Sequence, residues 1–224
     1  ITAPPGVLYA YFIDPGENAV IPFTEGNGDY TVVGYQQIQG DQYAALYSEI
    51  LTVELENDFL PFLYPNQYVN FSPDSEASKL ALSMVSEDTT DVDALKQIYN
   101  YVVNNLTYDY DKAETVETGY LPDVDETLST KTGICFDYAA LTTAMLRSCD
   151  IPCKLQIGYT GDIKHAWIDV YIRSKGWVTG AVSFNGDSWS LMDPTFDSSA
   201  DSDDTEAIQD YIGNADNYTV QFTR

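Results

Sequence analysis

The chain has 224 residues, 35 of them acidic and 10 basic, which gives a formal net charge of −25 at pH 7. Lys and Arg are too scarce and scattered to follow a phosphate backbone, so most forms of nucleic-acid binding are excluded, and docking on anionic membranes is disfavoured. Hydrophobic residues make up 44% of the chain, which is enough for a sizeable core. No apolar run reaches the length of a membrane span. The start at Ile1, without Met or a signal peptide, and the strong acidity predict a trimmed piece of an exported bacterial protein.

Residues 1–72 are expected to form a β-rich, sandwich-like domain. Apolar or alternating runs at residues 7–13, 18–23, 30–35 and 43–56 are separated by turn residues, which favours four or five short strands. Residues 58–74 contain three prolines and predict an ordered but irregular connection. Its large apolar side chains are expected to pack on the following domain: Phe59, Leu60, Phe62, Leu63 and Phe71.

Helical periodicity follows this connection. Apolar residues recur at helical spacing over residues 77–85, 92–106 and 135–148. Thr90 with Asp93 three residues later predicts the start of the second of these helices. Pro152 lies just beyond the third and predicts its end. We expect residues 107–130 to be a loop that ends in a short extended stretch.

The second half of the chain predicts an antiparallel sheet. Strand patterns cover residues 155–159, 165–172, 177–182 and 189–193, with a hairpin turn at 174–176. An acidic loop at 197–204, a short helix at 206–212 and a closing strand at 218–222 are expected after them. Helices followed by such a sheet indicate an α+β domain over residues 73–224.

Three cysteines and a single histidine restrict the metal and disulfide chemistry of the chain. Zinc sites built on several histidines are excluded, and the cysteines lack a fourth ligand and suitable spacing, so we expect no metal and no cofactor. Cys149 and Cys153 flank a sharp turn, where they form either a disulfide or two buried thiols. Cys135 is expected to remain the free thiol.

Cys135 lies where a Gly-containing turn starts a helix, so free backbone N–H groups and the positive helix end can stabilise its thiolate. A thiol nucleophile also needs a base, and His165 is the only imidazole in the chain. Asp193, at the end of a later strand, can orient that imidazole. Each residue alone also has a structural explanation: a small buried thiol, a packed histidine, and an aspartate that begins a turn before proline.

Residues 133–141 read Gly-Ile-Cys-Phe-Asp-Tyr-Ala-Ala-Leu, and His-Ala-Trp-Ile at 165–168 and Leu-Met-Asp-Pro-Thr-Phe at 191–196 follow in order. Together with Tyr108-Asp109, this set resembles the core of the transglutaminase-like superfamily over about residues 75–197. Residues 61–68 and 120–125 resemble segments of exported transglutaminase-like proteins of Gram-positive bacteria. The resemblance implies a papain-like α+β fold in which Cys135 is the nucleophile, His165 the general base and acid, and Asp193 its orienting group.

The same resemblance implies that the Cys135 N–H helps to hold the oxyanion. A second donor is not identified by the sequence: Tyr108 and Tyr120 are candidates, and both also fit packed loop tyrosines. The implied function is thiol-dependent acyl transfer or hydrolysis at amide bonds of protein or peptide substrates, including cell-wall peptide. The alternative is a cell-surface or cell-wall binding module with a retained but inactive triad. Both functions place the protein outside the cell or on its surface.

Overall fold

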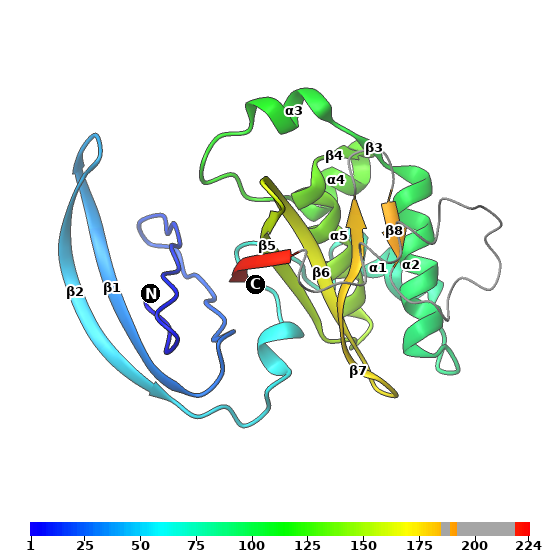
Figure 1. Cartoon of the computed structure of the whole chain (residues 1–224), viewed down its shortest axis with the longest axis horizontal. Coiled ribbons are helices and arrows are strands. Elements are labelled where there is room, and N and C mark those ends of the chain that lie inside the picture. The colour runs from blue at the N-terminus through cyan, green and yellow to red at the C-terminus, as the bar shows by residue number, and fades with distance from the viewer. Residues whose placement is uncertain (185–188, 192–217) are drawn as a thin grey trace.

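A computed structural model of the chain describes residues 1–184, 189–191 and 218–224 (Figure 1). Its central feature is a five-stranded antiparallel sheet in the order β8-β7-β6-β5-β9. The strands are β5 (Cys153–Thr160), β6 (Ile163–Ile172), β7 (Gly176–Phe184), β8 (Trp189–Leu191) and β9 (Tyr218–Thr223). This confirms the expected antiparallel sheet and its closing strand, whereas the helix expected at 206–212 and the acidic loop lie outside the described residues.

Close approach of β9 to β5 depends on Gly158. A Cβ atom at this position would lie 1.9 Å from the carbonyl oxygen of Thr219 in β9, closer than any real contact. Gly158 also pairs with His165 of β6 on its other side. The glycine therefore lets the last strand complete the sheet next to the strand pair that carries the histidine.

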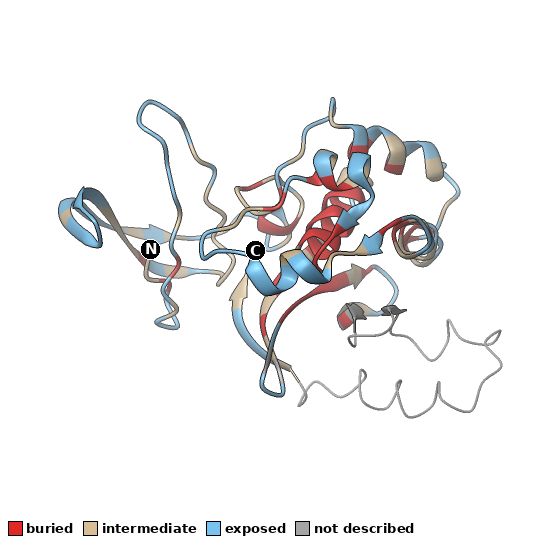
Figure 2. Ribbon diagram, turned by 90° about the horizontal axis from the view of Figure 1, so that it is seen from above, coloured by how far each residue is buried: buried red, intermediate tan, exposed pale blue. Residues whose placement is uncertain are grey.

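The three helices with clear periodicity form where the sequence predicts them, as α1 (Glu76–Met84), α2 (Asp91–Asn105) and α5 (Cys135–Ser148). The Thr90 side chain accepts a hydrogen bond from the Asp93 N–H at 3.1 Å and so caps α2. Helix α5 is buried on nearly all sides between the other helices and strands β5 and β6 (Figure 2). The residues of β6 that face this helical layer are Ala166, Ile168, Val170 and Ile172.

Residues 107–130 are not the loop that the sequence predicts. They form β3 (Thr107–Tyr108), α3 (Tyr110–Thr115) and α4 (Val124–Thr130), and β3 pairs in parallel with β4 (Thr132–Gly133). The Asp109 side chain caps α3 at the Lys112 N–H, and the Asp123 side chain caps α4. Helices of six and seven residues are too short to show an apolar period, so this prediction was wrong.

The sandwich expected for residues 1–72 is only partly confirmed. The region contains one two-stranded antiparallel sheet, β1 (Gly28–Gln39) and β2 (Gln42–Val53), and residues 7–13 and 18–23 are not strands. The backbone of Phe12 binds the Gln67 side chain at 3.2 Å, and the Ala10 carbonyl accepts a hydrogen bond from the Tyr68 hydroxyl at 2.8 Å. Residues 7–13 thus form hydrogen bonds with side chains of the 58–74 connection, where a sandwich would need a neighbouring strand.

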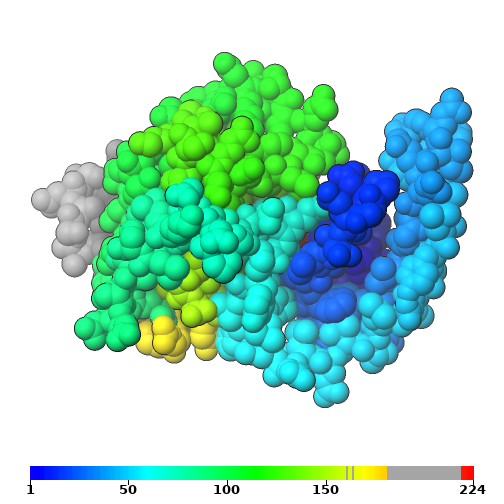
Figure 3. Space-filling model, turned by 180° about the vertical axis from the view of Figure 1, so that it is seen from behind, coloured from blue at the N-terminus to red at the C-terminus, as the bar shows by residue number. Residues whose placement is uncertain are grey.

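Aromatic contacts join the first 72 residues to the rest of the protein. Phe59, which precedes the short η1 helix (Leu60–Phe62), and Phe62, its last residue, pack on Trp177 of β7 with ring centroids 6.3 and 5.4 Å away. Phe71 packs against the helical core. In Figure 3, the N-terminal segment lies between the β1–β2 hairpin and the main body. The expected packing of the connection is therefore confirmed for these three phenylalanines, while the domain boundary near residue 72 stays a prediction.

The side chain of Arg224 connects the two ends of the described chain. Its guanidinium carbon lies 4.5, 5.0 and 4.1 Å from the ring centroids of Tyr9, Tyr11 and Tyr68, and the residue is buried. The Arg224 Nη1 also donates to the Tyr11 hydroxyl at 3.0 Å. A buried cation held by aromatic faces stabilises the contact between the N-terminal segment and the sheet.

Candidate active site

Cys135 is the first residue of α5, and its thiol is free. Three polar groups lie near the sulfur: the N–H of Phe136, the N–H of Ala166 and the hydroxyl of Tyr108. Burial is the largest influence and raises the pKa of the thiol, the nearby carboxylate of Asp137 also raises it, and the three polar groups lower it. The net shift is upward, so the resting thiol is protonated at neutral pH.

His165 immediately precedes Ala166 on β6, so the thiol contact brings Cys135 next to the histidine-bearing part of the strand. The β6–β7 pairs begin at Ile168, which leaves Ala166 beyond the end of that ladder. His165 is 7% exposed, and its ring is nearly parallel to that of Trp167, with centroids 6.3 Å apart. Burial lowers the pKa of His165 to about 4, so its imidazole is neutral at pH 7 and can act as a base.

Asp193, the third residue of the predicted triad, lies outside the described residues. The thiol–imidazole hydrogen bond and the orienting role of Asp193 therefore stay predictions. Of the predicted set, the structure brings the Cys135 thiol to the strand that carries His165.

A buried ion pair secures the start of α5. Asp137 is fully buried, and its carboxylate lies 2.8 Å from the Nζ of Lys112 in α3. The same carboxylate accepts hydrogen bonds from the Ile134 N–H at 2.8 Å and from the hydroxyl of Tyr120. Gly133 makes room for this cap, because a Cβ there would lie 2.6 Å from the Asp137 Cβ. We call Lys112, Tyr120 and Asp137 the Asp137 cluster.

The Asp137 cluster gives Tyr120, one of the two tyrosine candidates, a structural role. The sequence analysis did not identify this cluster. The Tyr120 hydroxyl donates to Asp137 and accepts from the Lys112 Nζ at 2.7 Å, so it stabilises the helix start. For Asp137, the sequence did contain a signal. The residue lies two positions after Cys135, in the first turn of the predicted helix, where a carboxylate can cap the helix start. Lys112 and Tyr120 gave no such signal, because they reach Asp137 from a separate segment.

Tyr108 of β3 pairs with Gly133 of β4, and Gly133 lies two residues before Cys135. The Tyr108 hydroxyl lies near the backbone N–H and the sulfur of Cys135, and both groups influence the pKa of the tyrosine. Burial raises the pKa of Tyr108 to about 12, so the hydroxyl keeps its proton at neutral pH. This tyrosine therefore lies near both the Cys135 thiol and the backbone N–H to which the family resemblance assigns the oxyanion.

The other two cysteines are free thiols, not a disulfide. The Cys153 sulfur is 3.5 Å from the Thr143 hydroxyl inside the core. Burial raises the pKa of Cys149 to about 11 and that of Cys153 to about 12. Both thiols are thus protonated and unreactive at neutral pH. Of the two alternatives that the sequence left open, a disulfide or two thiols, the structure contains the two thiols.

Within the part of the chain that the structure describes, no three His, Cys, Asp or Glu side chains are grouped so that they could hold a metal ion. Across residues 1–184, 189–191 and 218–224, no helix is both long and apolar enough to cross a membrane.

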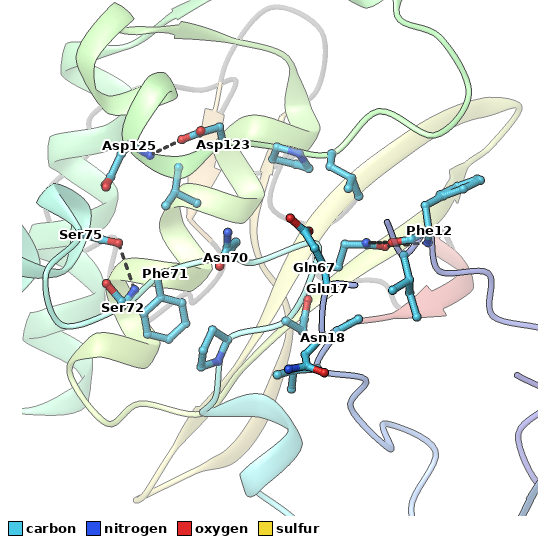
Figure 4. Close-up of a pocket in the computed structure, with 18 of the residues that line it drawn as sticks. Phe12, Glu17, Asn18, Gln67, Asn70, Phe71, Ser72, Ser75, Asp123 and Asp125 are labelled. Atoms are coloured by element: carbon cyan, nitrogen blue, oxygen red, sulfur yellow. Dashed lines mark hydrogen bonds between the residues drawn. The ribbon is translucent and has the colours of Figure 1, made fainter. Parts of the chain in front are cut away.

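A cavity of about 740 Å³ lies where the N-terminal segment meets residues 65–75 and 121–125 (Figure 4). Tyr108, Cys135 and His165 are not among the residues that line it. Two of its carboxylates have structural roles, because Asp123 caps α4 and Asp125 accepts a hydrogen bond from the Ala77 N–H at 2.9 Å. The cavity is therefore not part of the thiol site.

Parts of the chain are similar to known proteins. The Transglutaminase-like superfamily profile matches residues 78–180. The uncharacterized protein YebA of Bacillus subtilis is 24% identical over 183 residues, which cover 71% of this chain and 25% of YebA. The UPF0252 protein MJ1282 of Methanocaldococcus jannaschii is 40% identical over 62 residues, which cover 25% of this chain and 18% of MJ1282. The chain thus corresponds to a quarter or less of either relative.

Among solved structures, a candidate cysteine protease from Cytophaga hutchinsonii superposes with a TM-score of 0.45 and 19% identity, over 72% of this chain and 67% of that one. The match of the superfamily profile includes Tyr108, Cys135, Asp137 and His165. Residues 78–180 are therefore assigned to the transglutaminase-like superfamily.

Proposed function

We propose that the protein catalyses thiol-dependent acyl transfer or hydrolysis at amide bonds of protein or peptide substrates. Membership of the superfamily supports thiol chemistry at amides in general. The observation that carries the proposal is the set of three donors on the Cys135 sulfur at the start of a buried helix. Such donors stabilise the negative charge that develops on sulfur when the thiol loses its proton.

In the proposed reaction, a neutral thiol meets a neutral imidazole, because burial raises the pKa of Cys135 and lowers that of His165. His165 takes the thiol proton while the sulfur attacks the amide carbon, and Asp193 orients the imidazole. A C–S bond forms, and the carbonyl electron pair becomes an oxyanion held by the Cys135 N–H. The C–N bond then breaks, and the imidazolium returns its proton to the leaving amine.

The resulting thioester is resolved by an acceptor that His165 deprotonates. Water as acceptor gives proteolysis or deamidation, and an amine gives crosslinking. The new bond to the acyl carbon replaces the C–S bond, and the proton returns to the thiol. We propose that the substrates are extracellular or cell-surface proteins or peptides, including cell-wall peptide, which fits the acidic composition of the chain.

A second candidate function is a cell-surface binding module with an inactive triad. The β1–β2 hairpin favours it, because several large apolar side chains there are more than half exposed. These residues are Tyr35, Ile38, Tyr43, Leu46, Tyr47 and Ile50. The two functions differ in whether Cys135 can be acylated.

Intact-mass analysis after incubation with p-nitrophenyl acetate tests the proposal. We expect one acetyl group on the wild type and none on Cys135→Ala, and we expect His165→Asn to slow acetylation by about 10²-fold or more. Cys149→Ala is the matched control, because it removes a half-buried thiol elsewhere and should be acetylated like the wild type. Hydroxylamine should release the acetyl group faster than water alone. A wild-type protein that is not acetylated at Cys135 would favour the binding module.

A further inference from the structure

We propose that the outer edge of strand β2 binds an extended polypeptide segment in which basic and apolar side chains alternate. The segment adds a third strand to the β1–β2 hairpin and is held by main-chain hydrogen bonds. Neither Cys135 nor His165 belongs to this hairpin, so the inference goes beyond the proposed acyl transfer and does not depend on it. It gives the exposed hairpin a partner of stated chemistry, whether or not the thiol is active.

The hairpin has one free edge. On the side of β1, Thr2 and Thr31 exchange two backbone hydrogen bonds of 2.8 and 2.9 Å. Among the residues that the structure describes, β2 pairs with no strand other than β1. In Figure 1, β2 lies on the outer side of the hairpin, away from the N-terminal segment. A free edge strand of 12 residues presents unpaired N–H and C=O groups that a further strand can use.

Strand β2 carries few of the features that prevent such pairing. Natural edge strands are commonly protected by lysines, prolines or bulges. β2 contains neither lysine nor proline, and Glu49 is its only charged residue. The register shift after Gly34 leaves an unbroken ladder in which residues 28–34 pair with residues 47–53. We place the added strand along this regular stretch of β2.

The two faces of this stretch differ in chemistry. Ile50 pairs with Thr31, so the two side chains share a face, and Tyr35 lies on the same face four residues further along β1. Ile50 and Tyr35 are 65% and 63% exposed, which makes this an exposed apolar face. Glu49 projects from the opposite face, because successive side chains of a strand alternate. An added strand therefore places its side chains alternately beside Ile50 and beside Glu49, which suits apolar and basic residues in turn.

Charge decides which partner fits this edge. Residues 1–78 contain 11 acidic side chains and no Lys, Arg or His. Three of the acidic residues, Asp29, Asp41 and Glu49, belong to the hairpin. A second copy of the chain would bring another hairpin of the same sign and a further net charge of −25 to the edge, which is unfavourable. A basic segment is attracted instead, and its apolar side chains cover the exposed apolar face.

Fluorescence anisotropy with a labelled ten-residue peptide of alternating Lys and Val tests the proposal at about 0.15 M salt, where distant charges are screened. A peptide of alternating Glu and Val controls for charge and should not bind. The Lys-Val peptide N-methylated at its four central residues keeps the charge but loses main-chain donors on both edges. We expect this methylated peptide to bind about tenfold more weakly than the unmodified one.

Two pairs of variants locate the binding surface. Glu49→Lys should weaken binding of the Lys-Val peptide about fivefold, and Ile50→Lys should do the same, because each brings a like charge beside the added strand. Glu87→Lys is the control for Glu49→Lys, since it makes the same change of charge at an exposed site outside the hairpin. Leu82→Lys is the control for Ile50→Lys, because Leu82 is a half-exposed apolar residue of α1. Both controls should bind as the wild type does.

Four results would overturn the proposal. The first is a wild-type protein that does not bind the Lys-Val peptide or binds the Glu-Val peptide equally well. The second is equal binding of the methylated peptide, which would exclude strand addition. The third is equal weakening by the hairpin variants and their controls, which would indicate general attraction to an acidic surface. The fourth is a wild-type dimer in sedimentation analysis that Ile50→Lys dissociates, because a second copy would then occupy the edge.

Discussion

The buried ion pair between Lys112 and Asp137 predicts a large and specific cost for losing its positive charge. In Lys112→Met, Asp137 would keep the hydrogen bonds from Tyr120 and the Ile134 N–H but would lose the cation 2.8 Å away. Removing one partner of a buried pair typically costs about 3–5 kcal/mol. The Lys112 side chain is 32% exposed, which weakens the pair through solvent screening, so we expect a loss of about 2–3 kcal/mol.

Urea denaturation of the wild type and Lys112→Met measures this loss as a difference in the free energy of unfolding. Lys79→Met is the matched control, because Lys79 pairs with Glu76 at the same 2.8 Å but on the surface. We expect the control to keep the wild-type midpoint, since exposed pairs contribute little. The double variant Lys112→Met with Asp137→Asn should recover part of the loss, because the uncompensated buried charge is gone.

The same variant should also affect the nucleophile. Without Lys112, the charge of Asp137 is uncompensated two residues from Cys135, where a carboxylate already raises the pKa of the thiol. Alkylation of Cys135 by iodoacetamide at pH 7 should therefore slow in Lys112→Met. A variant that unfolds at the wild-type midpoint, or differs from it by less than about 1 kcal/mol, would refute the assignment of a buried, stabilising pair.

Two other predictions concern pH and domain organisation. The pKa of His165 falls from its ordinary 6.5 to about 4 on folding, so the unfolded chain binds the proton more readily, and stability should fall as pH drops from about 6.5 to about 4. Urea denaturation across this range should show up to about 3 kcal/mol more loss for the wild type than for His165→Asn; parallel curves would contradict the burial of a neutral imidazole. A fragment of residues 73–224 should lose about 3 kcal/mol or more, because Arg224 loses the ring contacts of Tyr9, Tyr11 and Tyr68, and Trp177 loses its phenylalanine cover. Thermal unfolding of the fragment at the wild-type temperature would instead indicate an independent domain.

The elements with a long local pattern could be predicted from the sequence. Helix α5 begins at Cys135 and ends at Ser148 as expected, and Thr90 caps α2. Strand β6 alternates as expected, with Ala166 directed to the helical layer. These features depend on residues within one or two turns of each other, so periodicity and capping are enough to define them. The ordered motif set also identified Cys135 and His165 as candidates.

Only the tertiary structure decided which distant side chains meet. Lys112 reaches Asp137 across 25 residues, and Arg224 reaches Tyr11 across 213, which no local spacing can encode. The helices α3 and α4 were missed because their caps at Asp109 and Asp123 stabilise segments too short to show a period. Tyr108 lies near Cys135 because β3 pairs in parallel with β4, and local spacing does not encode this pairing between separate segments. Which donors surround the thiol is decided by strand pairing and helix packing, because those contacts alone fix the positions of residues from separate segments.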